Sequence, residues 1–368
     1  MENFAHTLLG LSFAKAGLER ATPLATTALV VASNLPDIDV LPRSLLGDTS
    51  AYLEYHRGFT HSFIGLALLA LILTLLLTWI DRRFRLRRDH RRRPMRPLRL
   101  FWLAYLGGLG HTFMDFTNNY GVRPLLPFSR RWFYGDLVFV VDPWIWLILG
   151  SAVVWLTTTN RGRGFVWLVI GVLLSLVMTV APQTLMQGLP PLPALVRVVW
   201  FVGLGVVAVG TLMGWGRQGE RLARYSLVVV ALYYGGMWMA HQSALRHAAT
   251  PLPAEGVRQL AAWPTPANPS LWQAAAASDD AAFLRSIHLR DQDGEWLKQP
   301  TLDARFVEAL RQSHDGQVFL DFARFYSAAV EESNEGYTIT LRDLRFNLQL
   351  HARLDHDLNV TAAETRWF

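Results

Sequence analysis

The sequence contains no cysteine. This absence excludes disulfide bonds, thiolate nucleophiles and cysteine-ligated zinc, so any metal site has to use histidine, aspartate and glutamate. Charged residues are also scarce: they make up 17% of the 368 residues, whereas hydrophobic residues make up 51%. A soluble protein of this size usually carries more charge, so the composition favours burial in a membrane.

A recognition motif for nucleic acid is missing, although the formal net charge is +6. Residues 81–99 hold ten arginines against Asp81 and Asp89, which is +8, so the other residues sum to −2. An arginine cluster directly after an apolar stretch is typical of a cytoplasmic loop, and we expect no nucleic-acid partner. A basic segment ahead of the first apolar stretch is missing too, so no cleavable signal peptide is predicted.

Apolar stretches of membrane-spanning length recur along the first two thirds of the chain. The clearest are 63–80, 101–116, 143–156, 165–180, 195–213 and 225–240, and two shorter ones precede them at 4–18 and 23–35. Every second loop between them is basic, which the positive-inside rule places in the cytoplasm. The pattern therefore predicts a multi-pass protein of the bacterial inner membrane, with the N-terminus and everything after residue 240 facing the periplasm.

The last third of the chain lacks long apolar stretches and differs in composition. Five prolines predict a linker over 245–269, and 270–368 is predicted to be a small exported domain. A helix is expected over 304–311, and alternating apolar residues over 337–341 and 344–350 indicate half-buried strands with a bulge at the slip. The predicted fold is thus mainly α: a polytopic helical membrane domain, 1–244, followed by a small soluble α+β domain that can bind a protein partner.

Ionisable residues interrupt these apolar stretches at few places. His111 and Asp115 lie four apart inside 101–116, so a helix puts them on one face. A buried ionisable residue in a membrane helix is costly and is a functional hypothesis by default. The structural alternative is a His–Asp pair that locks two helices together.

Two further strings carry possible ligands. Asp37 and Asp39 follow Pro36, which disfavours helix before it, so both carboxylates are predicted in a short non-helical segment where they can reach one ion. His56 and His61 flank an Arg-Gly pair just before 63–80, which suits a bent loop with both imidazoles turned inward. The alternatives are solvated aspartates at a helix end and surface histidines.

The predicted topology brings these residues, together with His6 and Asp142, near the same outer face of the membrane, with His111 one turn deeper. Histidines and carboxylates without cysteine match the ligands of hydrolytic zinc and related divalent sites, which polarise a carbonyl or phosphoryl oxygen. Asp39 is a candidate general base or second ligand, and Arg57 can pair with a phosphate. Asp142 is a candidate catalytic partner or a simple helix cap.

Several short strings agree with one known family. They are LPDID at 35–39, HRGFTHS at 56–62, GHTFMD at 110–115, and NYG at 119–121 followed by Asp142-Pro143. Over residues 1–150 the chain resembles the bacterial membrane-bound metal-dependent hydrolase family, once described as a domain of unknown function. The resemblance implies metal-dependent hydrolysis, and the C-terminal segment is similar to that of longer members.

The order of ligands is also distantly similar to that of zinc-dependent phospholipases C and single-strand nucleases. Their pattern of His, Asp, His, then His-x-x-x-Asp falls here on His6, Asp37 or Asp39, His61, and His111 with Asp115. The later His and Glu pair of those three-metal enzymes has no equivalent here, and nothing marks a processed terminal amine. The resemblance therefore implies one or two ions rather than three.

The sequence thus predicts a divalent-metal-dependent hydrolase that acts on a phosphoester of a lipid or lipid-linked substrate. The predicted metal is zinc, with manganese or iron as alternatives, and the predicted ligands are His6, Asp37, Asp39, His56, His61, His111 and Asp115. The competing hypothesis is a non-catalytic binding or assembly protein, or a transporter, with a structural His/Asp cluster. Transport is disfavoured because the ionisable residues gather at one face rather than at the bilayer midplane.

Overall fold

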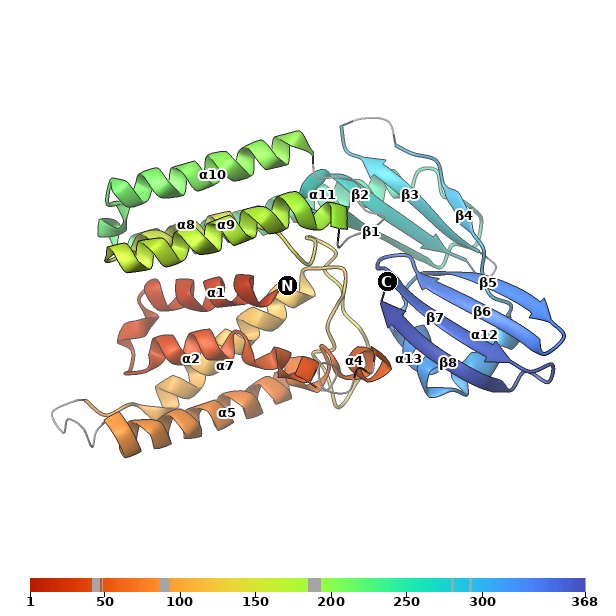
Figure 1. Cartoon of the computed structure of the whole chain (residues 1–368), viewed down its shortest axis with the longest axis horizontal. Helices are drawn as coiled ribbons and strands as arrows, with labels where there is room; N and C mark the ends of the chain where they lie inside the picture. The colour runs from red at the N-terminus through yellow and green to blue at the C-terminus, as the bar shows by residue number, and fades with distance from the viewer. Residues whose placement is uncertain are drawn as a thin grey trace. The chain divides into compact units, whose positions relative to one another are not determined.

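The computed structural model describes residues 1–41, 47, 49–85, 93–184, 193–278, 281–290 and 293–367. Contacts divide the chain into two compact units (Figure 1). The helical unit consists of Met1–Pro36, Phe59–Trp238 and Thr265–Pro269. The sheet unit consists of Asp37–Gly58, Met239–Pro264 and Ser270–Phe368.

Long helices build the helical unit, and every predicted apolar stretch forms one. They are α1 (Asn3–Lys15), α2 (Ala25–Ala32), α5 (Phe63–Ile80), α7 (Pro97–Phe116), α8 (Pro143–Thr157), α9 (Arg161–Thr184), α10 (Ala194–Leu212) and α11 (Glu220–Ala248), whose last turns belong to the sheet unit. Short turns connect them: η1 (Leu18–Arg20), η2 (Leu35–Val40), η3 (Phe59–His61), η4 (Asp81–Arg85) and η5 (Trp215–Gln218).

Small residues let three of these helices approach closely. A Cβ atom on Gly10 of α1 or on Gly107 of α7 would lie 2.9 Å from the Leu29 carbonyl of α2. Small residues at helix crossings allow this kind of backbone contact in membrane proteins. The core of this region is correspondingly built mainly from alanine and leucine, and its buried residues are Ala28, Ala32, Ala70, Leu73, Leu77, Met95, Leu100 and Ala104.

Apolar side chains also cover the outside of the helical unit. On α5 these include Leu68, Leu71, Leu75 and Trp79, and α10 presents a similar row from Leu195 to Leu212. Soluble monomers rarely expose apolar surface this extensively, so these faces suit contact with lipid.

Within the described residues, two helices have the length and hydropathy of a membrane span: Phe63–Arg85 and Ala194–Leu212. The helix Pro143–Thr157 is apolar but shorter. The helical character of the N-terminal region is therefore confirmed, whereas the full multi-pass arrangement and its orientation stay predictions. Of the loops used to predict that orientation, residues 86–92 and 185–192 lie outside the described residues.

The sheet unit contains two four-stranded sheets, ordered β1-β2-β3-β4 and β5-β6-β7-β8. The strands are β1 (Gln259–Thr265), β2 (Asn268–Ala277), β3 (Ala282–His288), β4 (Leu297–Gln299), β5 (Tyr326–Ser333), β6 (Gly336–Asp343), β7 (Leu348–Leu354) and β8 (Val360–Trp367). Helices α4 (Thr49–Tyr55), α12 (Ala304–Arg311) and α13 (His314–Phe322) complete it. A small C-terminal α/β region after the helices is thus confirmed, including the helix predicted over 304–311.

The predicted bulge is wrong, because the slip in the apolar alternation separates two strands. Residues 344–347 connect β6 to the antiparallel β7. In this connection Arg345 forms a fully buried ion pair with Asp343 at 2.9 Å and donates a hydrogen bond to the Phe322 carbonyl at 2.7 Å. The buried pair fixes the turn, and a sequence pattern of period two cannot distinguish such a turn from a bulge.

The observed units differ from the predicted domain boundaries at two places. Strand β1 lies inside the predicted linker 245–269, and it tolerates Pro264 because it is an edge strand. Residues 37–58 group with the sheet unit rather than with the flanking helices. The reason is contact between α4 and α13, where Ser50 hydrogen-bonds Asp315 and Glu54 lies 3.7 Å from His314.

Candidate metal centre

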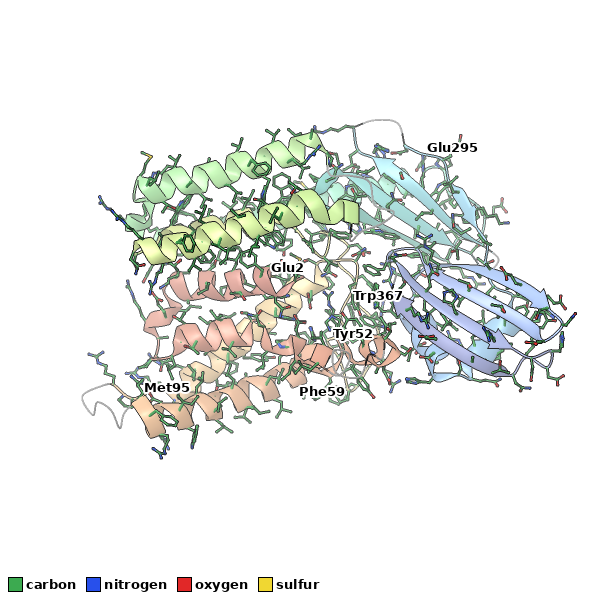
Figure 2. The ribbon with its side chains drawn as sticks, viewed as in Figure 1. Glu2, Tyr52, Phe59, Met95, Glu295 and Trp367 are labelled. Atoms are coloured by element: carbon green, nitrogen blue, oxygen red, sulfur yellow. The ribbon has the colours of Figure 1, made fainter. Side chains whose placement is uncertain are left out.

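Three histidines and one aspartate meet inside the helical unit. His6 comes from α1, His61 from η3, and both His111 and Asp115 from α7. All four are completely buried. Figure 2 shows Glu2 and Phe59 toward one end of the helical unit and Met95 at the other, so the turns that carry His6 and His61 lie away from the arginine-rich end.

One ligand atom from each of three of these residues converges on a common point. The three residues, His61, His111 and Asp115, are called the helical cluster below. The Nε2 atoms of the two histidines are 3.0 Å apart, and each lies 3.3 Å from Oδ2 of Asp115. Zinc bonds of about 2.0–2.2 Å in a tetrahedron place neighbouring ligand atoms about 3.3–3.5 Å apart. The three separations are therefore close to those of a divalent metal's ligand set.

The outer nitrogens of both histidines are already engaged. Nδ1 of His111 donates to the Ser33 carbonyl at 2.8 Å, because a carbonyl can only accept. Nδ1 of His61 lies 3.0 Å from the Thr60 hydroxyl, and the Thr112 hydroxyl donates to the His61 carbonyl at 3.2 Å. Such outer hydrogen bonds fix the tautomer and orientation of metal-binding histidines.

The three atoms can share one cation. Nδ1 of His111 donates to the Ser33 carbonyl, so in the neutral ring Nε2 of His111 presents a lone pair. Nε2 of His61 lies 3.0 Å from that atom and Oδ2 of Asp115 lies 3.3 Å from it. Imidazole nitrogens and a carboxylate oxygen at these separations fit a divalent ion.

His6 lies on the other side of the same carboxylate. Its ring stacks on His111 at 3.8 Å between centroids, and its Nε2 is 3.5 Å from Oδ1 of Asp115. Among the described residues, none forms a hydrogen bond with its buried Nδ1. The Met1 amino group also pairs with Oδ1 of Asp115, a contact that the sequence analysis does not anticipate. His6 therefore lies beside the helical cluster and faces Oδ1 of Asp115, whereas His61 and His111 face Oδ2.

Local sequence explains how His61 reaches this position. Ser62 caps α5 by accepting from the Gly65 amide at 3.0 Å, and its hydroxyl donates to the Phe59 carbonyl at 2.8 Å. A Cβ atom on Gly65 would lie 1.8 Å from that carbonyl oxygen. Glycine at this position is thus required for the turn η3 to fold back against α5 and present His61.

A second group lies in the sheet unit and consists of Asp37, Asp39 and His56, called the sheet-unit cluster below. One ligand atom of each lies within 4.8 Å of the others. Asp39 accepts from Nδ1 of His56 at 2.9 Å and from the Arg57 amide at 3.1 Å. Tyr52 stacks on His56 at 4.6 Å. Here the Asp39 carboxylate orients its neighbours His56 and Arg57.

One local prediction for this segment needs correction. Asp37 and Asp39 lie in the 3-10 helix η2 rather than in a non-helical segment, since proline is accepted in the first turn of a helix. In the loop after His56, the residue with a positive φ is Arg57, at 55°. A left-handed conformation is costly for a residue with a side chain, and Arg57 is only 2% exposed, so this loop holds a buried arginine in a strained backbone conformation.

Asp142 has a capping role at the start of α8. Its Oδ1 accepts from the amides of Trp144 at 2.9 Å and Ile145 at 3.3 Å, and its Oδ2 accepts from the Tyr233 hydroxyl at 2.7 Å. Burial raises the pKa of Asp142 to about 6, although these three hydrogen bonds favour the ionised form. These contacts match the helix-cap alternative, and a catalytic role stays a prediction.

Comparison with known proteins identifies the N-terminal region. The family described as YdjM inner membrane protein matches residues 1–185, half of the 368 residues. The chain belongs to this family. The YdjM match includes the helical cluster and the sheet-unit cluster, and it supports a location in the inner membrane.

Other matches concern the C-terminal region and one curated protein. The family described as YfhP C-terminal alpha/beta plait domain matches residues 305–368, which contain α13 and β5–β8. The uncharacterized protein YfhP of Bacillus subtilis (strain 168) is 28% identical over 145 residues. This match covers 39% of the present chain and 40% of YfhP, well under two thirds of either. No solved structure matches the chain.

Proposed function

We propose that this YdjM-family protein is a divalent-metal-dependent hydrolase of the inner membrane that cleaves a phosphoester in a lipid or lipid-linked substrate. The observation that carries the proposal is the convergence of His61 Nε2, His111 Nε2 and Asp115 Oδ2 within 3.0–3.3 Å of one another. A divalent ion held by these atoms supplies Lewis acidity toward a phosphoryl oxygen. Zinc is the first choice because the donors are imidazole and carboxylate, with manganese or iron as alternatives.

The protein's own groups prepare this centre. Ser33 and Thr60 hold the two imidazoles so that their Nε2 atoms face inward. Complete burial of the four side chains excludes bulk water, which strengthens every electrostatic interaction there. The proposal includes the roles that the sequence predicts for Asp39 as general base and for Arg57 as phosphate ligand.

Turnover by purified full-length protein tests the proposal. The protein is incubated in detergent with added zinc, manganese or iron and with phosphomonoester, phosphodiester, ester and amide substrates, both lipids and soluble compounds. We expect release of phosphate or a phosphorylated headgroup from a lipid substrate, and none from the Asp115→Asn variant. Metal-loaded protein that turns over none of these substrates would rule out the hydrolase.

A glycine substitution tests the role of the Arg57 side chain separately, because it removes the guanidinium and suits the positive φ at this position. Glycine adopts a positive φ without cost, so Arg57→Gly keeps or raises the thermal stability. If the guanidinium binds the substrate phosphate, the same variant loses about 10–100-fold in kcat/KM, the effect of losing a charge-assisted hydrogen-bond partner. Unchanged kcat/KM with lower stability would assign Arg57 a structural role instead.

A non-catalytic function is the alternative that one observation favours. The 3.0 Å separation of the two Nε2 atoms also allows a direct N–H···N hydrogen bond between His61 and His111. A cluster held in that way would lock η3 against α7 and leave the C-terminal region to bind a partner. A co-purifying protein that persists after His111→Ala, in preparations without metal, would support this alternative.

A further inference from the structure

A large apolar cavity lies among α8, α9 and α10 of the helical unit. Its volume is about 720 Å³, within the roughly 300–1,000 Å³ typical of small-molecule sites. Its walls include Leu147, Val154, Leu168, Leu174 and Leu204. Gly150, Gly171 and Ser175 also line it, and these small residues leave the space that larger side chains would fill.

Most polar groups in the wall have partners within the protein, although the buried Thr158 hydroxyl has none among the described residues. The hydroxyls of Ser151, Ser175 and Thr211 donate to backbone carbonyls of their own helices at 2.7–3.0 Å. The indole N–H of Trp200 donates to Ser175 at 3.0 Å, and that of Trp167 donates to Thr157 at 2.9 Å. The walls therefore offer an occupant apolar contact and little hydrogen bonding, which suits a hydrocarbon chain.

The cavity and the helical cluster share one element, the first turn of α1. Phe4 lines the cavity, and its ring packs edge-on against Trp146 at 5.8 Å. Two residues later His6 stacks on His111. Residues two apart on a helix point to nearly opposite sides, so the width of one helix separates the cavity from the cluster.

We propose that this cavity binds the hydrocarbon chain of the phosphate-bearing lipid whose headgroup reaches the helical cluster. This inference rests on the proposed function, because it names the apolar part of that substrate. Lining residues such as Leu168 and Val172 are exposed, and a chain of methylene groups that lies against them buries apolar surface, which favours binding. The site then distinguishes lipids by chain length and bulk, independently of the metal.

Photo-crosslinking tests the site without requiring turnover. The probe is phosphatidic acid with a diazirine in its acyl chain, added to the detergent-purified full chain, and labelled peptides are mapped by mass spectrometry. The cavity-filling variant is Gly171→Leu, because no atom lies within 4 Å of a Cβ placed there. Its matched control is Gly205→Leu, a helical glycine with equally open space that does not line the cavity.

We expect saturable labelling of the α8, α9 and α10 wall, unchanged in Gly205→Leu. Labelling should fall about tenfold in Gly171→Leu, which corresponds to excluding roughly two methylene groups. The Asp115→Asn variant should keep the labelled peptides of the wild type but lose the preference for phosphatidic acid over diacylglycerol, so the chain site is tested independently of turnover. Excess unlabelled phosphatidic acid should compete better than diacylglycerol with the same chains.

Three results would overturn the inference. One is non-saturable labelling spread over the exposed faces of α5 and α10, which would indicate bulk lipid. Another is wild-type labelling in Gly171→Leu. The third is equal competition by diacylglycerol, which would show that an ordinary membrane lipid occupies the cavity instead of a phosphate-bearing substrate.

Discussion

The two clusters of histidine and aspartate differ in the arrangement of their ligand atoms. In the sheet-unit cluster, Asp39 accepts from both Nδ1 of His56 and the Arg57 amide, so this carboxylate orients its neighbours. In the helical cluster, Nε2 of His61, Nε2 of His111 and Oδ2 of Asp115 lie 3.0–3.3 Å from one another. Proximity alone therefore does not indicate a metal site, whereas three ligand atoms at these separations favour one.

The largest change in metal affinity is expected for replacement of Asp115, and a much smaller one for replacement of Asp39. Asp115→Asn should weaken zinc binding by more than about 100-fold, because partners outside the ligand set alone contribute about 10–100-fold. Asp39→Asn should weaken the tightest site by less than about tenfold, because His56 and Arg57 are outside the helical cluster. Titration against a competing chelator measures both affinities, and equal losses would show that the two carboxylates do not differ in metal binding.

A backbone substitution tests whether the turn before α5 positions His61. In Gly65→Ala the new Cβ would lie 1.8 Å from the Phe59 carbonyl, so η3 must move. We expect metal affinity to fall by about 10–100-fold, as when the support of a ligand is lost. Gly205→Ala, in open space on α10, is the matched control and should bind like the wild type. Normal binding by Gly65→Ala would show that His61 is not a ligand.

The sheet-unit cluster should respond in stability rather than in metal content. Asp39→Ala leaves the Nδ1 of His56 and the Arg57 amide without their shared acceptor, and both residues are buried. A loss of about 1–3 kcal/mol in the free energy of unfolding is expected for such groups. The tightest metal site should stay filled. Metal-free Asp39→Ala protein would show that Asp39 is needed for metal binding.

The smallest expected effect is a pH dependence at the start of α8. The pKa of Asp142 in the folded protein is raised to about 6, above its ordinary value of 3.8. The folded state then binds more protons than the unfolded state between these values, so stability decreases as the pH rises through this window. Asp142→Asn keeps a good N-cap without the ionisation. Its Tm should therefore rise relative to the wild type between pH 4 and pH 7, and a constant difference would contradict the raised pKa.

Much of the fold follows from sequence patterns, but some contacts do not. Apolar runs of helical length predict every long helix, and the spacing of His111 and Asp115 predicts their shared face. The Ser33 carbonyl that orients His111 is a backbone group, and no side-chain pattern reports it. The glycine at position 107 is the available signal, because it marks a close helix approach.

The grouping of residues 37–58 with the sheet unit could not be predicted either. It depends on contacts of α4 with α13, which is about 260 residues later in the chain, such as Ser50 with Asp315. The proline-rich composition also predicts a linker where the structure has β1. An edge strand can accept Pro264 because it has one side without a partner strand. Long-range pairing of this kind is set by tertiary packing rather than by local propensity.

Elemental analysis of the detergent-purified full chain tests the central claim most directly. The wild type is compared with a His111→Ala, Asp115→Ala double variant, and with His247→Ala as a control histidine that pairs with Asp293 in the sheet unit. We expect stoichiometric zinc, manganese or iron in the wild type and in the control, and its loss in the double variant. The absence of bound metal in all three after supplementation, or equal metal in all three, would show that the helical cluster does not bind metal.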